Sequence, residues 1–245
     1  MKKIIANLKM NMTSREIKDY LLKLIVKNTH KNQIILCPPC PYLSLAKFLL
    51  NDSGIELGAQ NISDEDEGAF TGEISGKMVK DCGAEYVVVG HSERKTKFRE
   101  SARTINKKIK VALKNGLKVI LCVGEQLTDK NLDKTKEVLK TQIEDALKGL
   151  YENELDNILI AYEPVWAIGT GKTPQPKEVE QSVKYIRQVI CEDFSPKSEK
   201  IEVLYGGSID EKNASSFAKV SGVNGLLIGH TSLDVDHLIQ ISKSV

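Results

Sequence analysis

The sequence of 245 residues lacks the features that mark membrane, secreted or nucleic-acid-binding proteins. No stretch approaches the roughly 18 consecutive apolar residues of a membrane span, and Asn7 and Lys9 interrupt the apolar start too early for a signal peptide. The five cysteines are irregularly spaced, which is not a disulfide framework and favours a cytoplasmic protein. The formal net charge is only +2, with lysine and arginine spread along the chain, which argues against nucleic-acid partners.

Short apolar runs rich in β-branched residues recur along the chain and predict strands. Most of them are apolar almost throughout, which is typical of strands buried on both faces of a parallel sheet. These runs occupy residues 4–9, 33–38, 55–60, 85–91, 117–124, 157–164, 200–207 and 225–230.

Helical patterns lie between most of these runs. Residues 13–28 begin with Thr13 and Glu16 in capping-box spacing, residues 103–114 end at Gly116, residues 176–191 begin at Pro176, and a last helix is expected near Ser232. Eight strands alternating with helices fit either a closed (β/α)8 barrel or an open doubly wound sheet. The length favours the barrel, and no linker divides the chain, so we expect one domain over residues 1–245.

Polar residues gather where the predicted strands end. Asn7 and Lys9 end the first strand, His91 ends the fourth, Glu163 ends the sixth, and Ser208 follows the seventh. In a barrel the C-terminal ends of the strands meet at one face, which is where active sites lie. The pattern therefore predicts that these five side chains converge.

Six motifs carry a more specific signal. They are NLKMN (7–11), GAFTGEIS (68–75), GHSER (90–94), CVGE (122–125), AYEPVWAIGTGKT (161–173) and YGGSI (205–209). In this order and spacing they closely resemble the triosephosphate isomerase family, from the first strand to the last. The resemblance implies a TIM barrel that interconverts dihydroxyacetone phosphate and D-glyceraldehyde 3-phosphate through an enediolate, in glycolysis and gluconeogenesis, with no cofactor.

The resemblance also implies roles for individual side chains. Glu163 would be the base, His91 the electrophile that polarises the carbonyl, and Lys9 the cation for the phosphate and the developing enediolate. Asn7 would orient the oxygen end of the substrate, and Glu93 would support Lys9. A lone histidine or glutamate at a strand end is more often structural, so these assignments depend on the motifs around them.

The stretch after Glu163 resembles the family's lid, a loop that closes over the substrate and excludes water. The phosphate is expected to contact Asn7, Lys9, Gly169, Ser208, Gly229 and His230 at the loops after the last strands. The lid would comprise Pro164, Val165, Trp166, Ala167, Ile168, Gly169, Thr170, Gly171, Lys172 and Thr173.

Two further expectations concern the partner and one unusual residue. The loop at residues 68–73, with Phe70 at its tip, resembles the family's loop that reaches a neighbouring subunit and predicts a homodimer. His230 stands where the family usually has glycine. A backbone donor does not depend on its side chain, so we predict a negative φ at His230, at a helical position before Ser232.

Alternative functions remain open from the sequence alone. Another phosphate-handling barrel enzyme is one, although an aldolase would need a Schiff-base lysine where His91, Cys122 and Glu163 stand. A non-catalytic phosphate-binding protein on the same scaffold is another. The four histidines show no metal-ligand spacing. Cys37 and Cys40 form a C-x-x-C pair, but Pro41 follows at once, which disfavours a redox motif.

Overall fold

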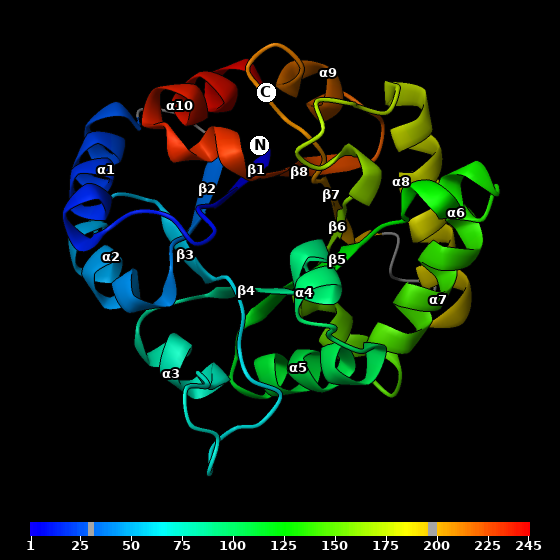
Figure 1. The fold of residues 1–245 in the computed structure, drawn as a ribbon, viewed down its shortest axis with the longest axis horizontal. Helices are drawn as coiled ribbons and strands as arrows, with labels where there is room; N and C mark the ends of the chain where they lie inside the picture. Colours follow the sequence, from blue (N-terminus) through cyan, green and yellow to red (C-terminus); the bar gives the residue numbers. More distant parts are fainter. Residues whose placement is uncertain (29–31, 196–199) are drawn as a thin grey trace.

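The computed structural model describes residues 1–28, 32–195 and 200–245. Its eight strands are hydrogen-bonded to their neighbours in chain order and close into a barrel, with the first strand paired to the last (Figure 1). The prediction of a closed (β/α)8 barrel is confirmed, and the open doubly wound sheet is excluded. The strands are β1 (Lys3–Asn7), β2 (Gln33–Cys37), β3 (Glu56–Ala59), β4 (Tyr86–Val89), β5 (Lys118–Val123), β6 (Ile158–Tyr162), β7 (Glu202–Tyr205) and β8 (Val223–Ile228).

Helices surround the barrel on its outer side (Figure 1). The α-helices of the described residues are α1 (Ser14–Lys27), α2 (Leu43–Leu49), α3 (Gly76–Asp81), α4 (Ser92–Lys97), α5 (Ala102–Lys114), α6 (Leu127–Asn131), α7 (Thr135–Leu147), α8 (Pro176–Asp193), α9 (Ala214–Ala218) and α10 (Val235–Ser244). Short 3-10 helices are η1 (Cys40–Tyr42), η2 (Glu152–Asn157), η3 (Val165–Ala167) and η5 (His230–Leu233).

Local sequence signals explain the first helix. The Thr13 side chain accepts a hydrogen bond from the Glu16 backbone, and the Glu16 carboxylate accepts one from the Thr13 backbone at 2.7 Å, which is the predicted capping box. Ile17, Leu21 and Leu24 recur at helical spacing and are fully buried, so one stripe of α1 packs on the barrel.

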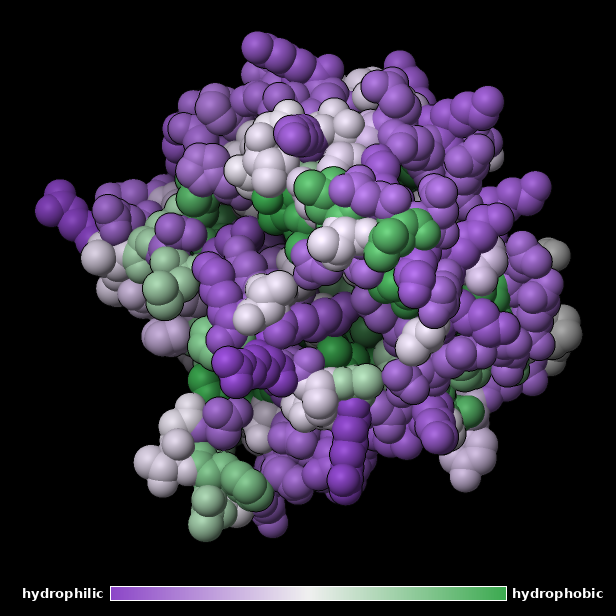
Figure 2. Space-filling model, turned by 45° about the vertical axis from the view of Figure 1, so that its right-hand side comes forward, coloured by the Kyte–Doolittle hydropathy of each residue, from purple (hydrophilic) through white to green (hydrophobic). Residues whose placement is uncertain are grey.

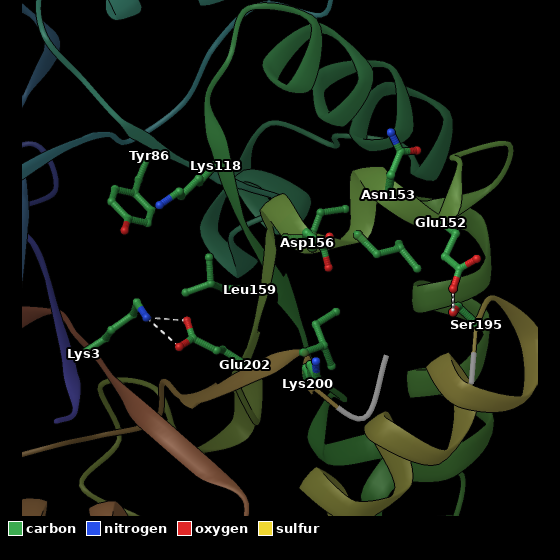
Figure 3. A pocket seen from close by; sticks show the side chains of 13 residues that line it. Lys3, Tyr86, Lys118, Glu152, Asn153, Asp156, Leu159, Ser195, Lys200 and Glu202 are labelled. Carbon is green, nitrogen blue, oxygen red and sulfur yellow. Dashed lines mark hydrogen bonds and ion pairs between the residues drawn. The ribbon is translucent and has the colours of Figure 1, made fainter. Parts of the chain in front are cut away.

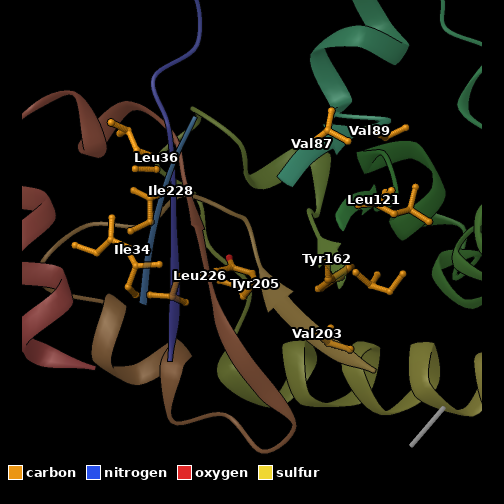
Figure 4. Close-up of a cluster of buried hydrophobic side chains, with 14 of the residues drawn as sticks. Ile34, Leu36, Val87, Val89, Leu121, Tyr162, Val203, Tyr205, Leu226 and Ile228 are labelled. Carbon is orange, nitrogen blue, oxygen red and sulfur yellow. The ribbon is translucent and has the colours of Figure 1, made fainter. Parts of the chain in front are cut away.

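The strands are buried on both faces because alternate residues enter two different cores. Ile5, Val88 and Ile120 point into the barrel with a small interior cluster, whereas Ile4 and Val87 belong to the large cluster between barrel and helices. Figure 4 shows part of this outer cluster, in which Ile34 and Leu36 from β2 and Leu226 and Ile228 from β8 belong to the two strands that flank β1. This double burial accounts for strand sequences that are apolar almost throughout.

The start of the last helix differs from the prediction. Ser232 lies in η5, and α10 begins only at Val235. The Asp234 carboxylate accepts hydrogen bonds from the backbone of Asp236 and His237 and so caps the helix. An aspartate that satisfies two free N–H groups is the stronger start signal, and the sequence analysis placed the boundary too early.

Candidate active site

One cavity of about 320 Å³ lies at the C-terminal end of the barrel. The loops that follow β1, β4, β6, β7 and β8 all contribute to it, because parallel strands end at the same face. Its lining includes the residues that the sequence analysis placed at the site, except Glu93 and part of the lid: Asn7, Lys9, His91, Glu163, Gly169, Ser208, Gly229 and His230.

Glu163 is the most buried polar side chain in this cavity. It follows β6 directly, its backbone N–H donates to the Val123 carbonyl at 2.7 Å, and it is only 2% exposed. Its Oε1 lies 3.3 Å from Nε2 of His91, and no described residue donates a hydrogen bond to its Oε2. A buried carboxylate oxygen without a donor is costly for stability and leaves acceptor capacity free.

Two glycines make room for Glu163. A Cβ on Gly124 would lie 1.8 Å from the Glu163 carbonyl oxygen, and one on Gly206 would lie 2.8 Å from the Glu163 Cγ. Neither separation is sterically possible, so only glycine allows the ends of β5 and β7 to approach β6 so closely. Gly124 therefore bounds the backbone of Glu163, and Gly206 bounds its side chain.

His91 is placed by the start of α4. It is the N-cap of this helix, and its Nδ1 accepts a hydrogen bond from the Glu93 backbone N–H at 3.3 Å. Because that lone pair is engaged, the ring proton of a neutral imidazole lies on Nε2, which faces Glu163 and the cavity. The Ser92-Glu93-Arg94 segment thus begins a helix and sets the histidine tautomer.

Lys9 has an unusual backbone conformation, with a φ of 53°. A left-handed φ at a non-glycine residue costs about 1 kcal/mol. The Asn7 side chain accepts from the Lys9 N–H at 3.0 Å, and the Gln60 side chain donates to the Lys9 carbonyl at 2.9 Å, so neighbours hold this bend. Strain maintained in this way is typical of functional positions.

The Lys9 ammonium is paired with Glu93 at 2.7 Å. Burial by itself would raise the pKa of Glu93, but the hydrogen bond and charge of Lys9 outweigh burial and lower it. Glu93 itself does not line the cavity. It contacts two residues that do, namely Lys9 and His91, whose Nδ1 lies 3.6 Å from Glu93 Oε2.

The segment 164–173 covers one side of the cavity, and its tip contacts the loop after β7. The Gly169 N–H donates to the Ser208 hydroxyl at 3.2 Å, and that hydroxyl donates to the Ala167 carbonyl. Gly169 and Gly171 have φ values of 67° and 73°, which glycine adopts without strain. Pro164, Val165, Trp166, Thr170 and Lys172 do not line the cavity, whereas Ile168, Gly169, Gly171 and Thr173 do.

His230 begins η5, directly after β8, and is not among the non-glycine residues with positive φ. The prediction of a negative φ at a helical position is confirmed. Gly229, His230 and Thr231 line the cavity, and Gly229 lies so close to Lys9 that a Cβ on it would be 3.1 Å from the Lys9 Cε.

Sequence reasoning missed several supporting residues. Gln60, at the end of the third predicted strand, holds the backbone at Lys9. Asn213 donates to the Ser208 carbonyl at 3.1 Å, and Thr231 donates to the Ile209 carbonyl at 2.6 Å, which ties the loops after β7 and β8 together. The only available signal was the position of Gln60 at a strand end.

The C-x-x-C pair, Cys37 and Cys40, lacks the lowered thiol pKa of a redox motif. Burial raises the pKa of Cys37 to about 12, and burial with the neighbouring Cys82 raises the pKa of Cys40. Both changes are opposite to the lowered thiol pKa of a redox C-x-x-C motif. Burial, with the nearby Glu163, also raises the pKa of Cys122 well above its usual value, as expected for a packed thiol.

Metal-binding clusters and membrane-spanning helices are both absent from the described parts of the chain. Residues 1–28, 32–195 and 200–245 contain no group of three or more histidine, cysteine, aspartate or glutamate side chains that could hold a metal ion. None of the helices described is both long and apolar enough to cross a membrane.

Comparisons with known proteins agree with one another. A model of the family described as triosephosphate isomerase matches residues 2–245. The triosephosphate isomerases of Aquifex aeolicus and Thermodesulfovibrio yellowstonii are each 44% identical to this chain, over 244 and 243 residues, and each alignment covers 98% of both chains. The crystal structure of triosephosphate isomerase from Bartonella henselae is 34% identical and has a TM-score of 0.89, covering 99% of this chain and 98% of that one.

Proposed function

The chain belongs to the triosephosphate isomerase family, and we propose that the side chains around its C-terminal cavity carry out the reaction of that family. The enzyme interconverts dihydroxyacetone phosphate and D-glyceraldehyde 3-phosphate, a step of glycolysis. The observation that carries the assignment of roles is the meeting of Lys9, His91 and Glu163 around one cavity, each in the loop after a different strand.

In our proposal Glu163 removes the proton from the carbon next to the substrate carbonyl. The electron pair of that C–H bond forms the carbon–carbon double bond of an enediolate, and the carbonyl oxygen becomes negative. The free Oε2 of Glu163 supports this role, since it has no donor among the described residues. The proton of the neighbouring hydroxyl moves to the oxygen that became negative, and Glu163 returns its proton to the former carbonyl carbon. The neighbouring carbon then carries the new carbonyl, which completes the isomerisation.

His91 and Lys9 are proposed to stabilise the oxygen that becomes negative. The Nε2–H of His91 lies 3.3 Å from Glu163, so a substrate between them would meet the donor and the base together. The Lys9 ammonium supplies positive charge, Asn7 fixes the bend that presents it, and Glu93 holds it in place. His91 and Lys9 thus act on charge that develops during the reaction, whereas Asn7 and Glu93 act through Lys9.

The phosphate is proposed to lie against the loops after β7 and β8. Backbone N–H groups at Gly229 and His230 are suited to a dianion because they donate hydrogen bonds without a counter-charge. The Gly169 N–H and the Ser208 hydroxyl, which here donate to Ser208 and Ala167, would turn to the phosphate when the lid closes. Residues 164–173 would act as the lid. Closure would keep water from an enediolate phosphate, which otherwise loses its phosphate.

A coupled assay with glyceraldehyde 3-phosphate and no added cofactor tests the proposal. We expect one product, dihydroxyacetone phosphate, and loss of activity when Glu163 or Lys9 is changed. An aldolase would instead form a Schiff base that borohydride reduces and traps on a lysine. A non-catalytic phosphate-binding protein would bind the triose phosphate without turnover, and either result would overturn the assignment.

We also propose that the enzyme is a cytoplasmic homodimer. The loop at residues 68–73 projects from the barrel below β4 and α3 in Figure 1, and Phe70 on it is 48% exposed. Other large apolar side chains are exposed as well, including Met10 and Met78. Figure 2 shows a mainly hydrophilic face with hydrophobic residues in separate groups, one of them on a projection at the lower left.

Burial against a second copy would remove these apolar side chains from water. Sedimentation at assay concentration should therefore give twice the mass of the chain, and Phe70→Asp should shift the equilibrium toward monomer. A wild-type monomer with full activity would contradict the homodimer.

A further inference from the structure

The first end of the lid is bound to a buried carboxylate. Glu125, directly after β5, is 1% exposed, and its Oε1 accepts a hydrogen bond from the indole Nε1 of Trp166 at 2.6 Å. The Glu125 carbonyl also accepts from the Val165 N–H at 3.0 Å. Side chain and backbone of one residue therefore hold the start of the lid.

Lys130 contacts the same indole from another side. It lies in α6, and its ammonium is 3.7 Å from the centroid of the Trp166 ring, within the range of a cation–π interaction. The Lys130 side chain is about one third exposed, so water does not fully screen this contact.

The same ammonium also reaches the second end of the lid. Lys130 Nζ lies 2.9 Å from Oε1 of Glu178, and Oε2 of Glu178 accepts from the Gln175 N–H at 2.6 Å. Gln175 and Glu178 form the capping box of α8, the helix that begins just after the lid. One lysine outside the lid therefore contacts the side chain at its beginning and the carboxylate that fixes the chain at its end.

The charges around Lys130 are consistent with this double role. The hydrogen bond from Lys130 is the main cause of the lowered pKa of Glu178, followed by that from the Gln175 backbone. Burial raises the pKa of Glu125, and the positive charge of Lys130 opposes that rise. These residues border a cavity of about 330 Å³ between α6, α7 and α8, so little other packing restrains the indole on that side.

We propose that Lys130 is a positioning residue that couples the two ends of the lid, acting through Trp166 and Glu178. The proposal rests on the proposed role of residues 164–173 as a lid over the substrate. With Lys130 in place, both ends of the lid are held by the same side chain before substrate binds. Without it the ends move independently, and the substrate must order a looser loop, which weakens binding while the proton transfer itself is unchanged.

Trp166 is the only tryptophan of the chain, so its fluorescence reports directly on the lid. In Lys130→Met we expect quenching of Trp166 by acrylamide to rise about twofold, KM to rise roughly three- to tenfold, and kcat to stay within about twofold. Lys130→Arg keeps the charge and the cation–π contact and should remain close to wild type. Glu178→Gln keeps an acceptor for Gln175 but loses the ion pair, and should lie between the two.

Lys136→Met is the matched control. Lys136 borders the same cavity and stacks on Tyr185, with its ammonium 5.3 Å from the ring centroid, which places it against α8 and away from the indole. Unchanged quenching and KM in Lys136→Met are expected. The coupling is refuted if Lys130→Met behaves like wild type, or if Lys136→Met shows the same increases.

Binding of 2-phosphoglycolate to the wild-type enzyme tests the lid proposal separately from the role of Lys130. The planar carboxylate of this compound imitates the enediolate. If the compound protects Trp166 from acrylamide quenching in wild type, but Lys130→Met has unchanged quenching and KM, the coupling by Lys130 is refuted and the lid proposal stands. Turnover without any change of Trp166 quenching on binding would overturn the lid proposal and the coupling together.

Discussion

At the N-terminal end of the barrel the charged side chains contact one another, whereas at the C-terminal end several of them face a cavity. Lys3 at the start of β1 pairs with Glu202 at the start of β7 at 2.6 Å (Figure 3). Gln33 donates to Tyr86 at 3.2 Å. At the opposite end Glu163 keeps an oxygen without a donor among the described residues, and Lys9 keeps a strained backbone. The first end contributes to stability, and the second holds groups ready for chemistry.

The larger cavity is not the catalytic one. The cavity at the N-terminal end has about 690 Å³ and the catalytic one about 320 Å³. Lys3 and Glu202 satisfy each other in the larger cavity, and Lys118 lies over the ring of Tyr86. In the smaller cavity, by contrast, Glu163 Oε2 has no donor among the described residues, so the pairing of the polar groups, and not the volume, distinguishes the two cavities.

The largest effect should follow from replacing Glu163. Glu163→Gln removes the proposed base and should lower kcat by about 10² to 10⁴, while Glu163→Asp withdraws the carboxylate by one methylene and should cost about a hundredfold. The coupled assay measures both. The free energy of unfolding should not fall in Glu163→Gln, because the neutral amide no longer buries a charge. Near-normal turnover in both variants would mean that Glu163 is not the base.

Lys9→Met is expected to have the next largest effect. Methionine keeps most of the length of the side chain but lacks the positive charge, so kcat/KM should fall by roughly 10² to 10³, as for loss of one donor to a developing oxyanion. Thermal unfolding should change little, since a partly exposed ion pair contributes about 1 kcal/mol or less. A loss below tenfold would assign Lys9 to structure, like the lysines at the other end.

His230→Gly tests whether the backbone alone serves the phosphate. We expect kcat/KM to change by less than tenfold, or about 1.4 kcal/mol, because the donor at this position is the N–H group. The pH dependence should match that of wild type. A larger loss that grows at low pH would show that a protonated imidazole binds the phosphate directly.

The smallest effect should come from Lys3→Met at the N-terminal end. Its ion pair with Glu202 is partly exposed, so the free energy of unfolding should fall by about 0.5 to 1 kcal/mol, and by less in high salt. The kinetic constants should equal those of wild type. A clear drop in kcat at unchanged stability would contradict the assignment of the N-terminal end to stability and the C-terminal end to chemistry.

Much of the fold was accessible from the sequence because its signals are local. Apolar runs marked all eight strands, and the Thr13–Glu16 pair marked the start of α1. The last helix was expected near Ser232, and α10 begins three residues later, at Val235, where Asp234 provides the cap. The motifs around Glu163 and His91 indicated the chemistry, and their positions at strand ends predicted one common face.

The sequence by itself determined the alternation of strands and helices, the family and the identity of the reactive side chains, because each depends on neighbours along the chain. Tertiary structure alone decided that Gln60 supports Lys9, that the Glu163 carboxylate keeps an oxygen without a donor among the described residues, and that Lys130 reaches Trp166 and Glu178. These contacts join residues brought together only when the barrel closes. No spacing along the chain encodes a distance across a barrel, and that is the physical reason they could not be predicted.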